Sequence, residues 1–82
     1  MNREYVLWNL REAKKSLDST ISQIERDPFY EDEDLIACVL HLYHHINMAW
    51  NAREASSNRA YQCSAQDFEK WRRFPKDLEV FV

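Results

Sequence analysis

The sequence predicts an all-α protein, in which an antiparallel hairpin of two helices is followed by a short third helix. Three observations lead to this fold class. The 82 residues include no glycine and only two prolines, so the chain lacks residues on which tight β-hairpins depend. Apolar residues recur at spacings of three and four, as they do along one side of an α-helix. Asp27-Pro28 interrupts this pattern, because the residue before a proline avoids the helical conformation.

The first helix is expected over residues 3–26. Its apolar residues fall within an arc of about 80° when each residue turns the helix by about 100°. This stripe comprises Val6, Leu10, Ala13, Leu17, Ile21 and Ile24. We expect the stripe to form the inner face of the hairpin, packed against the second helix.

The second helix is expected over residues 32–61, and its stripe is also assigned to the inner face. The stripe comprises Leu35, Ile36, Val39, Leu42, Tyr43, Ile46, Ala49 and Trp50. Acidic residues at the start of this helix complement the positive end of its dipole, with Asp32 as the expected cap. Ser56, Ser57 and Asn58 are poor helix formers, so the continuity of the helix at that point is left open.

The third helix is expected over residues 65–73, because Ser64 and Asp67 have the spacing of a capping pair. Phe68, Trp71 and Phe74 give it an aromatic side, which we expect to complete the core against aromatic residues of the first two helices. The tail over residues 75–82 ends in apolar residues and is expected to dock on the domain or on a second copy. All 82 residues are assigned to one domain.

Composition restricts the classes of function. A net charge of −3 gives the chain as a whole no attraction for nucleic acid or anionic membranes. No apolar stretch reaches the length of a membrane span and no secretory signal pattern is visible, so a cytoplasmic location is expected. Cys38 and Cys63 are too few for a disulfide framework and are interpreted as reduced thiols. A chain this short buries little apolar surface alone, which favours a partner.

The outer face of the second helix is predicted to be an interface between two copies of the chain. This face mixes histidine, methionine and small residues, and its centre carries no formal charge near pH 7. The predicted interface residues are Cys38, His41, His45, Met48, Asn47 and Asn51. For the asparagines we also consider a contact between helices that fixes their register. Two hairpins would then pair as a homodimer resembling a four-helix bundle.

The leading functional hypothesis is therefore a non-enzymatic helical interaction and dimerisation module, such as an accessory or regulatory subunit, with an unidentified protein partner as a further option. No catalytic residue is assigned, since no nucleophile stands in a recognisable relation to a histidine. Charge supports pairing: Glu25 to Asp34 carries six acids and one arginine, whereas Lys70 to Lys76 carries four bases and no acid. An antiparallel two-fold dimer would place each acidic turn near the basic segment of its partner.

Two alternatives stay open. The first is a metal-binding protein, because His41 and His45, with Cys38 and Asp34, offer ligands suited to zinc or another divalent metal. These four residues extend over about 16 Å of one helix axis, so a complete site would need ligands from another element. The second is weak nucleic-acid binding through Lys70, Arg72, Arg73 and Lys76, where bases alternate with aromatic residues.

Overall fold

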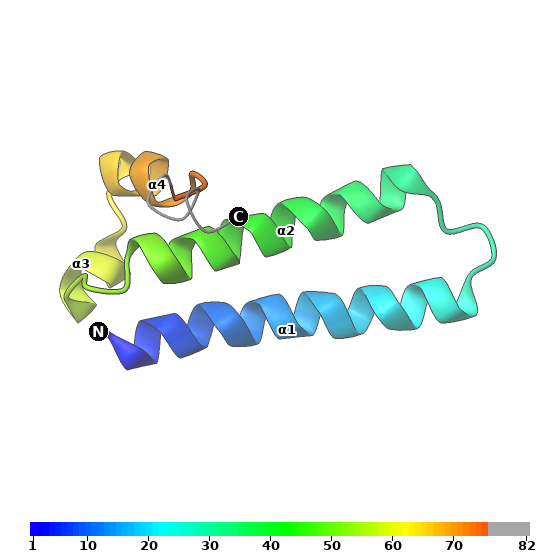
Figure 1. The fold of residues 1–82 in the computed structure, drawn as a ribbon, viewed down its shortest axis with the longest axis horizontal. Helices are drawn as coiled ribbons and strands as arrows, with labels where there is room; N and C mark the ends of the chain where they lie inside the picture. The colour runs from blue at the N-terminus through cyan, green and yellow to red at the C-terminus, as the bar shows by residue number, and fades with distance from the viewer. Residues whose placement is uncertain (76–82) are drawn as a thin grey trace.

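The computed structural model describes residues 1–75, and within that part of the chain all regular structure is α-helical. α1 (Arg3–Arg26) and α2 (Asp32–Asn51) lie side by side as a long antiparallel hairpin, and two short helices, α3 (Ser57–Gln62) and α4 (Ala65–Trp71), follow at its open end (Figure 1). The predicted all-α hairpin is confirmed. The expected docking of the tail and the predicted role of Lys76 fall on residues 76–82, outside the described part.

Local polar contacts set the ends of the hairpin helices. The side-chain oxygen of Asn2 accepts a hydrogen bond from the Tyr5 N–H at 3.1 Å, which caps α1. α1 ends before Pro28, as the sequence predicts. At the start of α2 the cap is Glu31 and not Asp32, and the Glu31 N–H donates to the carboxylate of Asp34 at 3.1 Å.

α2 ends at Asn51, ten residues before the predicted end at residue 61. Residues 52–55 are reasonable helix formers by composition, but a distant residue binds their carbonyl groups. The backbone N–H of Asn2 donates to the Arg53 carbonyl at 2.6 Å, and the Asn2 side chain donates to the Ala55 carbonyl at 3.1 Å. This tertiary contact ends the helix where local preference would continue it.

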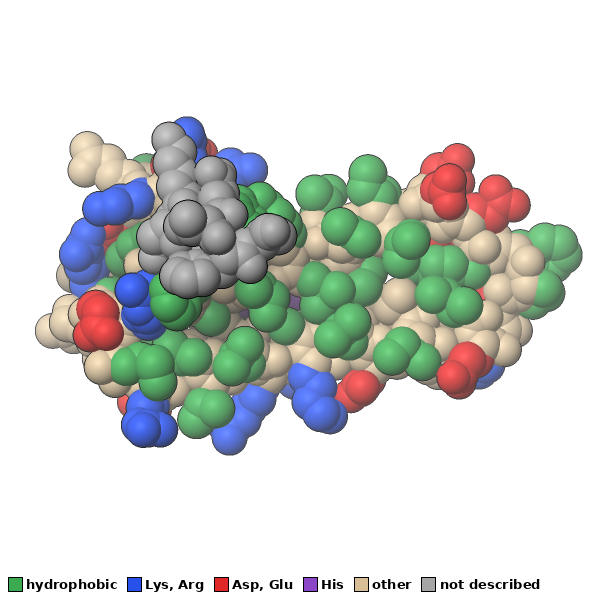
Figure 2. Space-filling view, viewed as in Figure 1, with side chains coloured by type: hydrophobic (Ala, Val, Ile, Leu, Met, Phe, Trp, Pro, Cys, Tyr) green, Lys and Arg blue, Asp and Glu red, His purple; other side chains and the backbone are tan. Residues whose placement is uncertain are grey.

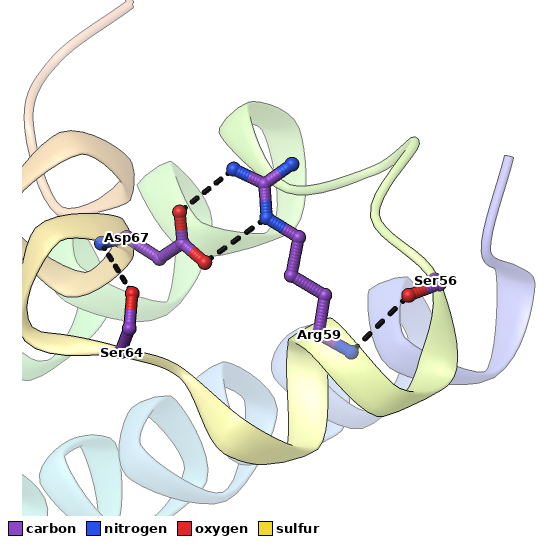
Figure 3. A network of polar contacts seen from close by, with 4 residues as sticks. All are labelled: Ser56, Arg59, Ser64 and Asp67. Atoms are coloured by element: carbon purple, nitrogen blue, oxygen red, sulfur yellow. Dashed lines mark hydrogen bonds and ion pairs between the residues drawn. The ribbon is translucent and has the colours of Figure 1, made fainter.

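Two serine caps start the short helices, and an ion pair joins them (Figure 3). The Ser56 hydroxyl accepts from the Arg59 N–H at 3.2 Å, and the Ser64 hydroxyl accepts from the Asp67 N–H at 3.1 Å. Arg59 donates to both carboxylate oxygens of Asp67, at 3.0 and 2.7 Å. This hydrogen bonding with Arg59 lowers the pKa of Asp67. The predicted cap at Ser64 is therefore present, while α4 ends at Trp71, two residues earlier than expected.

The structure corrects the predicted orientation of the two apolar stripes, because their large residues do not lie on the inner face of the hairpin and only small members such as Ala13 are buried there. The surfaces that face each other across the hairpin carry small and polar residues, with Asn9 and Ala13 buried on α1 and Cys38 and His45 buried on α2. Most large residues of the predicted stripes are exposed instead, for example Ile21 at 52% and Val39 at 50%. Each helix has one long neighbour and contacts it along a narrow strip, so a wide apolar stripe beside that strip is left uncovered.

The core of the described residues lies at the open end of the hairpin. Met48, Ala52 and Trp71 are buried there, and Tyr5, Ala55 and Cys63 pack around them. Of the predicted aromatic side of the third helix, only Trp71 enters this cluster. Trp8 stays 53% exposed, because α4 crosses the outer side of α2 and does not cover the start of α1. The predicted core of many aromatic residues is therefore corrected to a small cluster.

Candidate functional site

The most extensive candidate site is a continuous surface of apolar side chains along one long side of the hairpin, which we name the apolar face. Figure 2 shows these side chains gathered over both helices. Each large residue on it exposes between 41% and 57% of its area. The apolar face comprises Leu10, Leu17, Ile21 and Ile24 from α1 and Leu35, Ile36, Val39, Tyr43 and Ile46 from α2.

The helical geometry explains why both stripes point the same way. On each helix, a rotation of roughly 90° about the helix axis separates the apolar stripe from the side that faces the other helix. This rotation has the same sense on both helices, the sense in which residues advance along the sequence. Because α1 and α2 run in opposite directions, these two rotations bring the stripes to the same side of the hairpin. The face is about 20 Å long, because Leu10 to Ile24 advance α1 by about 21 Å, and it is about 20 Å wide, given the diameters of two helices. Its footprint of roughly 400 Å² is within the range of the largest patch on a typical monomer.

Beside the apolar face runs a buried polar seam between α1 and α2, centred on Asn9 and His45. The Nδ1 of His45 lies 2.8 Å from the side-chain oxygen of Asn9, and the Nε2 of His45 lies 3.0 Å from the Nε2 of His41. Asn9 is 1% exposed, and its amide nitrogen donates to the Tyr5 carbonyl at 3.1 Å. The Asn9 oxygen is therefore an acceptor, which assigns the His45 proton to Nδ1 and makes His41 the donor to the Nε2 of His45.

Burial lowers the pKa of two histidines in and beside this seam, His45 and His44. The pKa of His45 is lowered, first by burial and then by His41 and His44, while Glu12 opposes the change. The pKa of His44 is lowered by burial, by His41 and by Arg72. In residues 1–75 no buried side-chain nitrogen or oxygen lacks a hydrogen-bond partner. The seam is therefore a satisfied structural contact.

Asn47 and Asn51 hold α4 against α2. The Asn47 side chain donates to the Arg72 carbonyl at 2.9 Å, and the Asn51 side chain donates to the carbonyls of Trp71 and Arg73, both at 2.7 Å. These carbonyls lie at the end of α4, where no following turn of helix supplies donors. Both asparagines thus lie in a contact between helices of one chain, one of the two roles considered from the sequence.

The predicted interface residues are therefore mostly occupied within the chain. Cys38, His45, Asn47 and Met48 are buried, and Asn51 binds the end of α4. The sequence assigns these residues to one outer face of α2, whereas Cys38 and His45 face α1, and Asn47 and Asn51 face α4. The exposed residues available to a partner are the ones that the sequence assigns to the core.

The four predicted metal ligands do not come together. Cys38 lies against Ser16, with its Sγ 3.8 Å from the hydroxyl, and Asp34 accepts the cap hydrogen bond from Glu31. His41 and His45 do meet, but nowhere in residues 1–75 do three or more histidine, cysteine or acidic side chains cluster as a metal site would require. Cys38 and Cys63 are both free thiols, and burial raises the pKa of Cys63.

The predicted nucleic-acid residues lie on and after α4, where they are partly neutralised. Glu69 forms ion pairs with Arg72 at 3.2 Å and with Arg73 at 3.6 Å. Lys70 is exposed on the same helix. These bases thus form a compact group of modest net charge at one end of the molecule.

An open cavity of about 750 Å³ lies between the start of α1 and the short helices. Its walls include the aromatic residues Tyr5, Trp8, Tyr61 and Phe68, and His44 and Met48 of α2 also contribute. The sequence gives no indication of this cavity. No periodicity signals it, because its walls come from all four helices.

Comparisons with protein-family models, with curated proteins and with solved structures found no match to this chain. Within residues 1–75, no helix combines the length and the apolar character needed to cross a membrane.

Proposed function

We propose that the protein is a non-enzymatic helical interaction module, which self-associates by packing the apolar face of one copy against that of a second. The predicted homodimer is kept in this proposal, but its interface moves from the histidine side of α2 to the apolar face. Two hairpins joined in this way form a four-helix arrangement around one shared core.

One observation carries this proposal: large apolar side chains are exposed in two rows along most of the hairpin. Val39 and Ile46 of α2 and Leu17 and Ile21 of α1 each expose nearly half of their area or more. A stable interface buries about 800 Å² per partner, and the accessible area of a corrugated surface exceeds its footprint, which is roughly 400 Å² for this face. The apolar face would therefore form the centre of such an interface, and the residues around it would supply the remaining area.

A second copy is the occupant that this face fits best. A two-helix layer needs another layer of similar length to bury its apolar side, and another hairpin supplies two helices of matching length. Pairing through the same surface on both copies also closes the assembly, so no apolar face remains open to further copies.

The test compares two single substitutions of exposed apolar residues on the same helix. Val39 lies on the apolar face and is 50% exposed, while the neighbouring Leu40 lies on the outer side of α2 and is 62% exposed. By helix propensity alone Leu40→Asp costs slightly more than Val39→Asp, but only Val39→Asp places a charge in the proposed interface. We expect Val39→Asp to raise the dissociation constant at least about 100-fold and Leu40→Asp to leave it nearly unchanged.

Light scattering after size-exclusion chromatography measures the oligomeric state, and far-UV circular dichroism verifies that both variants stay helical. The expected wild-type result is a dimer with a dissociation constant of roughly 10 μM or lower. A wild-type chain that stays monomeric at about 100 μM would refute the proposal. Equal weakening by the two substitutions would show that this face is not the interface.

A further inference from the structure

We propose that the two copies pair about a two-fold axis that runs across the helices, so that the acidic turn of each copy lies against the basic segment 69–73 of the other, at the end of α4. This inference rests on the proposed function, because it specifies how the two apolar faces meet. It predicts the orientation of the partner from charges that lie outside the apolar face.

Two orientations bring the apolar faces together with two-fold symmetry. With an axis parallel to the helices, the α1–α2 turn of one copy lies over the same turn of the other. With an axis perpendicular to them, each turn lies over the open end of the partner, where α3 and α4 are found (Figure 1). Neighbouring helices are antiparallel in both, so helix dipoles do not distinguish the two orientations.

The turn end of the hairpin is strongly acidic. Six acids and one arginine between Glu25 and Asp34 give this segment a net charge of −5. All six acidic residues are exposed, and Figure 2 shows acidic side chains gathered at this end of the molecule. An axis parallel to the helices would therefore stack two segments of charge −5, whose repulsion opposes association.

The end with α4 is basic and borders the apolar face. Lys70, Arg72 and Arg73 outnumber Glu69, which leaves residues 69–73 with a net charge of +2. Tyr43 of the apolar face stacks on Phe74, with ring centroids 6.3 Å apart. Arg72 and Arg73 line one shallow hollow together with these two rings. The basic side chains are thus at the edge of the surface that the partner would cover.

With the axis across the helices, the acidic turn of each copy meets the basic segment of the other, so this attractive contact forms twice. This axis places each α2 opposite the α2 of its partner, running the other way, so the acidic start of one lies towards the α4 packed on the other. The segments of charge −5 and +2 then attract each other, whereas an axis parallel to the helices would bring together two segments of charge −5 that repel. Such interactions act over a screening length of about 10 Å. The charge distribution therefore favours the axis across the helices, which we call the crossed orientation.

Salt dependence gives the first test, with the wild-type chain and sodium chloride. We expect the dissociation constant to rise about threefold or more between roughly 0.05 and 0.5 M salt, because screening weakens the attraction. A dimer that tightens as salt is added would overturn the proposed orientation, since screening would then be relieving repulsion between the two turns.

Two charge variants give opposite expectations for the two orientations. Lys70→Glu/Arg73→Glu changes the net charge of residues 69–73 from +2 to −2, so in the crossed orientation the dissociation constant at about 0.05 M salt should rise at least about tenfold. Glu25→Lys/Glu33→Lys reduces the charge of the turn, and the dissociation constant should rise a few-fold. With turn on turn, the second variant would instead tighten the dimer, and the first would change little.

Arg11→Glu/Lys15→Glu is the matched control, because it changes the net charge as much as the α4 variant but lies towards the middle of α1. We expect it to alter the dissociation constant less than about twofold. A tighter dimer for the turn variant would reject the orientation and leave the apolar-face dimer standing. A wild-type monomer at every salt concentration would reject the proposed function itself.

Discussion

The polar seam between α1 and α2 is buried, and the apolar face beside it is exposed. Most globular proteins show the opposite arrangement, with apolar residues buried and polar residues exposed. The seam buries Asn9 and His45 with small residues around them. The apolar face exposes leucine, isoleucine and valine along both helices. A buried polar contact is tolerated when its hydrogen bonds are complete, whereas a wide exposed apolar surface usually marks a contact with another molecule.

The comparison shows that the two sides of an amphipathic helix can have different roles, one in the contact within the hairpin and one on the exposed surface. Small residues such as Ala13 and Ser16 let the hairpin helices approach, and hydrogen bonds fix their register at the seam. The large residues are then free to pack against a different helical layer. In this chain the strongest apolar periodicity lies on the exposed apolar face, which is the surface that we propose to bind a second copy.

The largest expected effect comes from placing the same charge at a buried and at an exposed position of α2. Met48 is 4% exposed and belongs to the core cluster, so Met48→Asp buries a charge without a partner. We expect it to lower the free energy of unfolding by about 3–5 kcal/mol, measured by urea denaturation. Leu40→Asp, at an exposed position, should change it by less than about 0.5 kcal/mol. Similar losses in the two variants would contradict the burial of Met48.

The seam itself can be tested at Asn9. Asn9→Ala removes the acceptor of the His45 Nδ1–H and leaves that buried donor without a partner. We expect a loss of about 1–3 kcal/mol in the free energy of unfolding, determined from denaturant titration. Ser19→Ala, at an exposed position of the same helix outside the apolar face, is the control. If Asn9→Ala were neutral, the seam would not depend on this hydrogen bond.

The attachment of α4 should respond less strongly. Asn51→Ala removes two hydrogen bonds to carbonyls at the end of α4, while Asn47 still binds the Arg72 carbonyl. We expect a loss of about 1–2 kcal/mol in the free energy of unfolding and faster hydrogen exchange of amides in α4. Amides in the middle of α1 should keep their protection. Unchanged exchange in α4 would mean that other contacts hold it.

The smallest expected effect is the pH dependence of stability that comes from the histidines in and beside the seam. The pKa values of His44 and His45 lie below their ordinary value of 6.5, so the unfolded chain takes up protons at a higher pH than the folded chain. Stability should therefore be complete above about pH 6.5 and fall as the pH is lowered below it. Denaturant titrations between about pH 7.5 and 5 measure this slope. A His44→Gln/His45→Gln variant should flatten it, and a slope of the opposite sign would contradict the assignment.

The fold class was predictable from local sequence patterns, and the structure contains the features that these patterns predict. Periodicity locates α1, Pro28 ends it, and Ser64 starts α4. The end of α2 was not predictable in this way, because Asn2, far away in sequence, determines it. No pattern in the sequence connects Asn2 with the segment after α2.

The candidate site was predictable in part. The stripe containing Leu17, Ile21 and Val39 was recognised as apolar, but periodicity alone does not say whether such a stripe meets the neighbouring helix or another molecule. His45 and Asn9 could have indicated the seam only as a pair, and they are 36 residues apart. Their proximity depends on the register of the hairpin, which the separate patterns of the two helices leave open.

Asn2 also has a dynamic consequence. It caps α1 through Tyr5 and at the same time binds the carbonyls of Arg53 and Ala55 beyond the end of α2. Fraying of the first turn of α1 must therefore release the segment that leads into α3, so the two places open as one cooperative unit. Hydrogen exchange at the two ends of this loop of about 50 residues should then report a single opening free energy, although each end alone resembles an independent helix terminus.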